Sequence, residues 1–361
     1  MARFPLAPGS TIGILGGGQL GRMLALAAAR LGFDVVVLTP EMQSCAVRVA
    51  ARGIIADYDD PVALESLARA ADVVTFEFEN VPAAVVEQLK AFGVEVAPNQ
   101  RSLAIAQDRV DEKIFLGGCG APTVDFVAVD SAAEVLAGLD RLGAPALLKT
   151  RRDGYDGRGQ TWVESHADAR DAFQRIGGAP AILEGRAAFR RELSVIAARG
   201  RDGEVVAYPP GENHHENGVL RRTRAPADVT PALNARIATI AARILTSLDY
   251  VGVMGVELFE LDDGRLLVNE FAPRVHNTGH WTLDGCEVDQ FEQHIRAIAG
   301  WPLGTVTPLA LVEMENLLGA EADDWLRLAG EAEARVWLYG KGDARPGRKM
   351  GHVNRLRPLK G

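Results

Sequence analysis

Short apolar runs alternate with amphipathic stretches over the first hundred residues. The runs Thr11–Leu15, Asp34–Leu38 and Val73–Phe76 predict strands, and Gln19–Leu31 has the apolar spacing of a helix. Strands that alternate with helices are typical of an α/β unit with a parallel sheet. We expect this unit to occupy residues 1–110.

A second and smaller α/β pattern is expected over residues 111–180. A helix predicted over Leu103–Leu116 leads into it. A strand (Asp125–Val129), a helix (Ala132–Leu142) and another strand (Ala146–Lys149) follow. The length of this pattern, about 75 residues, is small for a domain.

Residues 181–361 form a strand-rich remainder with one strong helical pattern at Pro231–Leu248. From about Pro308 the chain becomes basic, through Arg345, Arg348, Lys349, Arg355, Arg357 and Lys360. These charges are interpreted either as a solvated tail or as a segment that folds back. In the second case Lys341 and Arg348 would contact an anionic substrate.

The most informative chemistry lies on a predicted hairpin. Its strands are Tyr250–Glu260 and Arg265–Phe271, joined by an Asp-Asp-Gly turn. Such a hairpin brings Glu257 and Glu270 together on one face, with Asn269 beside them. Hard divalent cations need oxygen ligands of this kind, and Mg²⁺ bound in this way usually bridges substrate phosphates. The hairpin therefore predicts a nucleoside triphosphate site.

A glycine-rich turn, Gly16–Gly21, follows the first strand and begins the first helix. With Glu41 twenty residues further on, it has the form of the dinucleotide fingerprint. Its physics is more general, because glycines let the backbone approach a phosphate and the helix N-terminus attracts negative charge. A nicotinamide-dependent oxidoreductase is thus a rival hypothesis, although it gives no role to the hairpin carboxylates.

A strand-end lysine, Lys149, precedes a second glycine-rich loop, Gly154–Gln160. Such a loop can close over a polyphosphate while the lysine pairs with the phosphates, although this one is not a Walker A loop. The alternative is a polar hairpin. Further along, Ile182–Glu184 and Glu192 could hold an adenine and a ribose.

Histidines occur at His214 and His215 and again at His276 and His280. A transition metal is the less favoured interpretation of both pairs. The first pair has no third or fourth ligand at metal spacing. The second lies in a predicted loop and lacks the glutamate of the H-E-x-x-H motif.

Bulk composition narrows the function classes. The 361 residues allow two or three packed units, with 47% apolar and 24% charged residues. A net charge of −9 argues against nucleic acid and anionic membranes as partners. The three cysteines, widely separated, and the absence of a signal-peptide pattern indicate a reduced, cytoplasmic setting. The apolar stretch around Leu24–Leu31 is interrupted by Arg22 and Arg30, so we do not expect it to span a bilayer.

Taken together, the motifs resemble ATP-grasp ligases, and specifically the ATP-dependent 5-(carboxyamino)imidazole ribonucleotide synthase family of purine biosynthesis. The resemblance covers nearly the whole chain. It is carried by Gly16–Met23, Thr75–Pro82, Gly154–Gln160, Asn269–Trp281 and Pro346–His352. The last two segments favour this branch over a related ligase such as formate-dependent glycinamide ribonucleotide transformylase. One departure is Asp153, where the family more often has glycine, which would stiffen the loop.

The resemblance implies an α/β architecture with the ATP-grasp fold. A Rossmann-like preATP-grasp domain would span residues 1–110, a central lid module 111–180 and a larger C-terminal module 181–361, with an ATP-grasp core at about 111–300. ATP would lie between the last two. The small-molecule partners implied are ATP, bicarbonate and aminoimidazole ribonucleotide, with Mg²⁺, or Mn²⁺, as the cofactor. The protein would be a cytoplasmic homodimer.

The resemblance also implies roles for individual residues. Those implied for ATP are Arg109, Lys149, Gly154, Tyr155, Asp156, Gly157, Arg158, Gly159, Gln160, Glu184, Gly185, Arg186, Ala187, Glu192, His215, Asn269 and Glu270. Glu257 and Glu270 would hold the metal. Those implied for the ribonucleotide are Gly18, Gln19, Leu20, Glu77, Tyr155, His276, Asn277, Lys341 and Arg348. Catalytic roles are implied for Asp156, Arg158, Arg274 and Lys341.

The implied reaction begins with bicarbonate attack on the γ-phosphate of ATP, which gives carboxyphosphate and ADP. Carboxylation of the exocyclic amine of the ribonucleotide follows. A nucleotide-sensing protein that has lost turnover is a further alternative.

Overall fold

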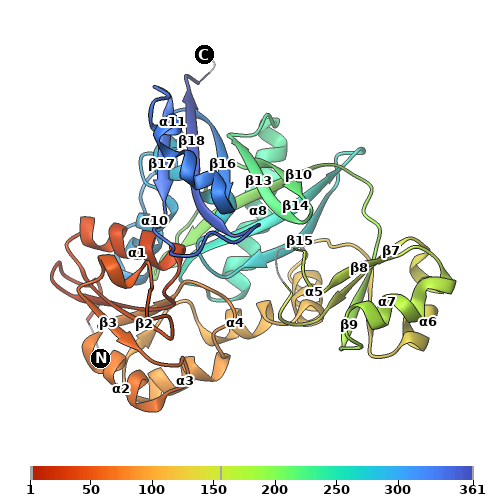
Figure 1. Cartoon of the computed structure of the whole chain (residues 1–361), viewed down its shortest axis with the longest axis horizontal. Helices are drawn as coiled ribbons and strands as arrows, with labels where there is room; N and C mark the ends of the chain where they lie inside the picture. Colours follow the sequence, from red (N-terminus) through yellow and green to blue (C-terminus); the bar gives the residue numbers. More distant parts are fainter. Residues whose placement is uncertain (1–2, 155–156, 360–361) are drawn as a thin grey trace.

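A computed structural model describes residues 3–154 and 157–359, and three sheets organise the chain (Figure 1). The N-terminal domain and the blue C-terminal strands lie on one side of the molecule. The central module projects from the other side as a separate lobe. No helix in the described part of the chain combines the length and apolarity needed to cross a bilayer.

The N-terminal domain contains a five-stranded parallel sheet of order β3-β2-β1-β4-β5, which confirms the predicted α/β unit. Its strands are β1 (Thr11–Leu15), β2 (Asp34–Thr39), β3 (Arg52–Ile55), β4 (Val73–Phe76) and β5 (Glu95–Val96). Its helices are α1 (Gln19–Arg30), η1 (Val47–Val49), α2 (Pro61–Ala70) and α3 (Ala83–Ala91). The central strands β1 and β4 are almost entirely buried, as expected where helices cover both faces of a parallel sheet.

Two helices stand where one was expected over Leu103–Leu116. They are α4 (Gln100–Ala106) and α5 (Arg109–Gly118). Asp108 separates them because its backbone is extended and its carboxylate accepts hydrogen bonds from the N–H groups at the start of α5, Val110 at 3.0 Å among them. The prediction of one continuous helix was wrong because it overlooked this N-cap signal.

The central module has a four-stranded antiparallel sheet of order β6-β9-β7-β8 and its own apolar core. Its elements are β6 (Phe126–Val129), α6 (Ala132–Leu142), β7 (Ala146–Thr150), β8 (Gln160–Val163), η2 (His166–Asp168), α7 (Ala169–Arg175) and β9 (Ala181–Gly185). Because β9 lies between β6 and β7, a module boundary at residue 180 cuts through this sheet. We therefore place the boundary after Gly185.

The C-terminal module is built on a nine-stranded sheet of order β15-β14-β10-β12-β13-β16-β18-β17, with β11 beside β10. Its strands are β10 (Phe189–Arg199), β11 (Val205–Ala207), β12 (Gly211–Glu216), β13 (Val219–Ala225), β14 (Gly252–Leu261), β15 (Leu266–Ala272), β16 (Leu311–Leu318), β17 (Ala334–Leu338) and β18 (Lys349–Arg357). Its helices are α8 (Pro231–Ser247), η3 (Asn277–Gly279), α9 (Thr282–Gly285), α10 (Gln290–Ala299), η4 (Gly319–Asp324) and α11 (Trp325–Ala329).

Alternate side chains of β10 pack into two separate apolar cores. Leu193 and Val195 pack in the cluster that contains the apolar face of α8, whereas Ile196 and Ala198 pack in the cluster that contains α10 and α1. Helices α8 and α10 therefore cover opposite faces of the sheet, and α10 joins it to the N-terminal domain.

The buried imidazole of His294, on α10, fixes this domain contact. Its Nε2 lies 2.8 Å from Thr75 Oγ1 of β4, and its Nδ1 accepts the N–H of Val253 of β14 at 3.0 Å. Burial lowers the pKa of His294 to about 3, so the ring is neutral.

The basic C-terminal segment is part of the main sheet. Strand β18 lies between β16 and β17, and Arg355 forms ion pairs with Glu315 at 2.8 Å and Glu331 at 2.7 Å. The interpretation as a solvated tail is therefore wrong for this strand, because its backbone is paired on both sides.

Candidate active site

The two hairpin carboxylates lie directly opposite each other on β14 and β15, as predicted. Burial, reinforced by the charge of Glu270, raises the pKa of Glu257 to about 7. Burial also opposes ionisation of Glu270, but Arg109 and Lys149 overcome it and lower its pKa to about 2. Two adjacent acids thus have pKa values that are shifted in opposite directions.

This donor set fits a divalent cation. The carboxylates supply hard oxygen ligands from one hairpin, and a shared cation would offset the burial and the charge of Glu270 that raise the pKa of Glu257. With only two carboxylates, further ligands would have to come from phosphate oxygens or water, which is the usual arrangement for Mg²⁺.

Helix α5 presents three charged side chains to this hairpin. Arg109 Nη1 lies 2.7 Å from Glu270, and Lys113 Nζ donates to the carbonyl of Asn269 at 2.6 Å. Glu112 accepts the N–H of Phe271 at 2.7 Å, and burial raises its pKa to about 8. Glu112 and Lys113 were missed from the sequence. The signal was their spacing of three and four residues from Arg109, which puts all three on one helix face.

Lys149 of β7 is buried and forms an ion pair with Glu184 of β9 at 2.7 Å. Lys113 lies 3.3 Å from the second oxygen of the same carboxylate. Burial raises the pKa of Glu184, but the two lysines more than offset this and lower it to about 2. Glu184 therefore turns toward the lysines and shares one charged cluster with them.

The glycine-rich loop reaches across to the C-terminal module. A Cβ on Gly157 would lie 3.1 Å from the carbonyl of Asn217 in the β12–β13 turn. Arg109 Nη2 donates to the carbonyl of Gly154 at 3.1 Å. Gly157 and Gly159 have φ of 79° and 70°, which side chains disfavour.

The structure describes some, but not all, of the other predicted loop residues. Arg158 and Gln160 are exposed. Tyr155 and Asp156 lie outside the described residues. Asp153, the departure from the family pattern, has φ of 61°, a conformation that glycine adopts without strain.

Glu192 of β10 and His215 of β12 form a hydrogen-bonded pair on the same sheet. Burial opposes protonation of the imidazole, but the bond to Glu192 outweighs it and raises the pKa of His215. The structure thus brings together these two residues, which lie 23 positions apart in the chain.

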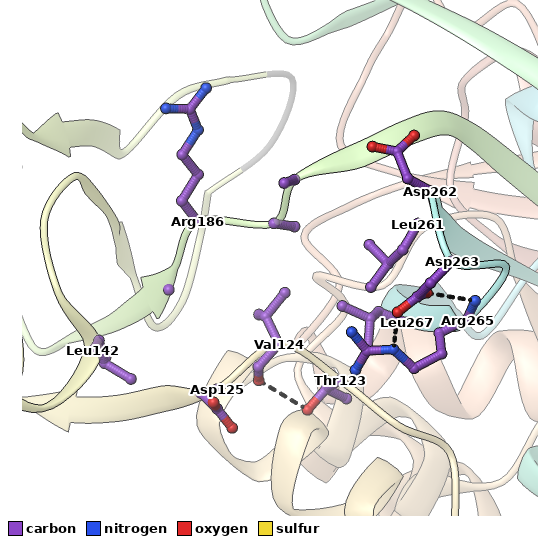
Figure 2. A pocket seen from close by; sticks show the side chains of 13 residues that line it. Thr123, Val124, Asp125, Leu142, Arg186, Leu261, Asp262, Asp263, Arg265 and Leu267 are labelled. Carbon is purple, nitrogen blue, oxygen red and sulfur yellow. Dashed lines mark hydrogen bonds and ion pairs between the residues drawn. The ribbon is translucent and has the colours of Figure 1, made fainter.

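A cavity of about 530 Å³ lies where the chain crosses from the central to the C-terminal module (Figure 2). One wall contains Gly185, Arg186 and Ala187, and the other contains Leu261 and Leu267 at the tip of the β14–β15 hairpin. The cavity therefore adjoins the segment predicted to line adenine. Strand β15 runs from this cavity toward the paired carboxylates.

The turn between β1 and α1 is filled by a side chain of the protein itself. The buried carboxylate of Glu77 accepts the N–H groups of Gly18 and of Gly21, the latter at 2.6 Å. A Cβ on Gly16 would lie 2.2 Å from Glu77 Cγ, so the glycines make room for this carboxylate. Three residues of this turn were predicted to bind phosphate. The N–H of Gly18 already donates to Glu77. Gln19 and Leu20 lie in the first turn of α1, where backbone N–H groups have no partner within the helix.

The loop after β15 carries three of the predicted residues. Both oxygens of Glu79 contact the guanidinium of Arg274, with Nη2 at 2.8 Å. His276 lies 3.7 Å from Glu257, and burial, followed by the charge of Arg274, lowers its pKa to about 3. Asn277 exchanges two amide hydrogen bonds with the buried Asn316, at 2.8 and 3.0 Å.

Lys341 lies between β17 and β18 and faces the N-terminal domain. Its Nζ donates to the carbonyl of Lys349 at 3.0 Å, and Arg48 of the N-terminal domain donates to the carbonyl of Gly340 at 3.1 Å. Burial, followed by the charge of Arg348, lowers the pKa of Lys341, while Glu77 opposes this shift. The segment thus folds back beside the N-terminal domain, whereas contact of Lys341 with an anionic substrate stays a prediction. Arg348 donates to the carbonyl of Asp343 at 2.9 Å within the same segment.

The chain is similar to known proteins in all three of its parts. Residues 10–107 match the ribonucleotide synthetase preATP-grasp domain, residues 115–291 the ATP-grasp domain, and residues 313–359 the phosphoribosylaminoimidazole carboxylase C-terminal domain. The N5-carboxyaminoimidazole ribonucleotide synthase of Brucella melitensis is 49% identical over 99% of both chains.

Solved structures are also similar over almost the full length. An N5-carboxyaminoimidazole ribonucleotide synthetase in complex with ADP is 40% identical, with a TM-score of 0.94 over 98% of this chain and 93% of that one. The Aspergillus clavatus N5-carboxyaminoimidazole synthase in complex with ADP and 5-aminoimidazole ribonucleotide is 32% identical, with a TM-score of 0.92 over 97% and 94%. The chain therefore belongs to the N5-carboxyaminoimidazole ribonucleotide synthase family and has the ATP-grasp fold.

Proposed function

We propose that this protein is an ATP-dependent carbon–nitrogen ligase that carboxylates the exocyclic amine of 5-aminoimidazole ribonucleotide with bicarbonate, in purine biosynthesis. The observation that carries the proposal is that strand β15 connects the cavity to the carboxylate pair. The strand leads from the cavity between the central and C-terminal modules to Asn269 and Glu270, where Arg109 contacts Glu270. A nucleotide with its base in this cavity would therefore direct its phosphates toward the carboxylate pair.

The first step needs charge neutralisation and positioning rather than a covalent enzyme intermediate. A bicarbonate oxygen attacks the γ-phosphorus of ATP, the bond to the β–γ bridging oxygen breaks, and ADP leaves. Lys149 and Arg109 offset the negative charge that develops, and the Gly154–Gln160 loop closes over the phosphates. The product is carboxyphosphate.

In the second step the amine nitrogen forms a bond to the carboxyl carbon and inorganic phosphate leaves. Arg274 and Lys341 would hold the anionic fragments, and Asp156 would orient the amine or accept its proton. A closed loop excludes water, which would otherwise hydrolyse carboxyphosphate.

Mg²⁺, or Mn²⁺, would be held by Glu257 and Glu270 and would supply charge stabilisation at the phosphates. Adenine would lie against Gly185–Ala187, and Glu192 and His215 would contact the ribose side of the nucleotide. The ribonucleotide phosphate would use the N–H groups of Gln19 and Leu20, near Lys341 and Arg348. We further propose a cytoplasmic homodimer.

The rival nicotinamide hypothesis loses support because Glu77 already engages two amides of the glycine turn. A deciding assay measures ADP release from MgATP and bicarbonate, with and without the ribonucleotide. We expect strong stimulation and one phosphate per carboxylated product. Intact ATP binding without stimulation would redirect the search to other amines and carboxylates.

A further inference from the structure

Gln290, the first residue of α10, holds the loop from which the substrate-facing side chains project. Its amide is fully buried. The side-chain oxygen accepts the N–H of His276 at 2.9 Å, and the side-chain nitrogen donates to the carbonyl of His276 at 2.7 Å. One amide thus pairs with both backbone groups of a single residue, as a neighbouring strand would.

The same amide also reaches the buried ring of His280. Gln290 Nε2 lies 3.2 Å from His280 Nδ1. Burial lowers the pKa of His280, so the ring is neutral. Because an amide nitrogen only donates, Nδ1 must be the acceptor, and the proton of the ring is then on Nε2. The backbone N–H of Gln290 donates to Thr282 Oγ1 at 3.0 Å, and this hydroxyl donates to the carbonyl of Gly279 at 2.7 Å. The loop is therefore anchored at three successive points.

We propose that Gln290 is a positioning residue that fixes His276, and with it the neighbouring side chains of Arg274 and Asn277, in the geometry that receives the ribonucleotide and bicarbonate. The proposal rests on the proposed function for its kinetic consequence, but its geometry does not depend on it. A backbone displacement of about 1 Å at such a loop is enough to cost about 100-fold in rate.

The chain contains a matched control on the same helix. Gln293 is equally buried, donates to the carbonyl of Gly304 at 2.8 Å and accepts the N–H of Gly304 at 2.8 Å. It therefore makes the same paired contact as Gln290, but to a segment that carries none of the candidate site residues. Changes at the two positions should cost similar stability and differ in their effect on catalysis.

The test compares Gln290→Glu with Gln293→Glu. Each change keeps the shape of the side chain but removes the donor to a buried carbonyl. We expect both variants to lose thermal stability to a similar extent. Gln290→Glu should lower kcat/KM for the ribonucleotide by about 10- to 100-fold, with the KM for ATP and the Kd for MgADP changed less than about twofold. Gln293→Glu should keep all of these constants within about twofold of wild type.

Two results would overturn the proposal: equal kinetics in the two variants, or a loss of MgADP affinity in Gln290→Glu that matches its loss of kcat/KM. If Gln290→Glu does not fold, Gln290→Met with Gln293→Met provides the same comparison.

A separate measurement uses the wild-type protein. ¹⁵N NMR should show the proton of His280 on Nε2, and a proton on Nδ1 would contradict the anchoring geometry. Absence of ribonucleotide-stimulated ADP release in wild type would refute the proposed function instead, and would leave this NMR result standing.

Discussion

Protonation of Glu257 should control how tightly the divalent cation binds. Its pKa is raised to about 7 by burial and by Glu270 directly opposite, whereas a metal ligand must be ionised. With that pKa, about 10% of this carboxylate is ionised at pH 6 and about 90% at pH 8. The apparent affinity for Mg²⁺ in the presence of ADP should therefore rise about tenfold from pH 6 to pH 8, or about 1.4 kcal/mol.

The assay is isothermal titration calorimetry of Mg²⁺ into the ADP complex, in two buffers with different ionisation enthalpies. The difference between buffers gives the protons released on binding. We expect about 0.9 at pH 6, about 0.5 at pH 7 and about 0.1 at pH 8 from this group. Glu257→Gln is the control, because protonation of the nucleotide is common to both proteins and cancels. The same proton release in wild type and variant would refute the reasoning.

The remaining predictions concern other buried groups. Glu77→Gln removes the charge that two amides of the glycine turn share, so the KM for the ribonucleotide should rise about tenfold or more while that for ATP stays within about twofold, as steady-state kinetics would show. Lys113→Met leaves a buried carboxylate with one cation fewer and should destabilise by about 3 kcal/mol in urea unfolding, whereas a loss below about 1 kcal/mol would contradict its buried pairing. Burial lowers the pKa of His294 from 6.5 to about 3. The neutral ring therefore contributes its full stabilisation of the folded protein above pH 6.5, and this contribution is lost as the pH falls toward 3. From pH 7 to 5.5 wild type should therefore lose about 1.3 kcal/mol more than His294→Asn in urea unfolding, and parallel losses would show that this ring is not the group responsible.

Sequence patterns predicted features that depend on neighbours along the chain. The β14–β15 hairpin needs only two strands and a turn, so the approach of Glu257 to Glu270 could be predicted. Their direct pairing also depends on an irregularity in the register between Glu257 and Leu258, which the sequence pattern does not mark. The alternation of β1, α1 and β2 was equally readable, because each element buries one regular face.

What could not be predicted depends on contacts between distant segments. Glu77 is held by amides 56 and 59 residues earlier in the chain, and nothing local marks it as buried. Gln290 resembles any polar residue at a helix start until His276 is placed beside it. The placement of β18 between two strands likewise requires knowledge of partners that the pattern of one strand does not contain.

The order of the last strands has a consequence for the newly made protein. Within the described part of the chain, β17 pairs with β18 alone, and β18 is synthesised after both of its neighbours. While a ribosome is still making β18, the strands β10, β14 and β15 can already be paired, but Lys341 still lacks its partner, the carbonyl of Lys349 at the start of β18. An interrupted chain would thus possess the paired carboxylates of the hairpin and the glycine turn of the N-terminal domain, but not the final position of Lys341. The position of Lys341 is therefore fixed only once β18 has been synthesised and has paired between β16 and β17.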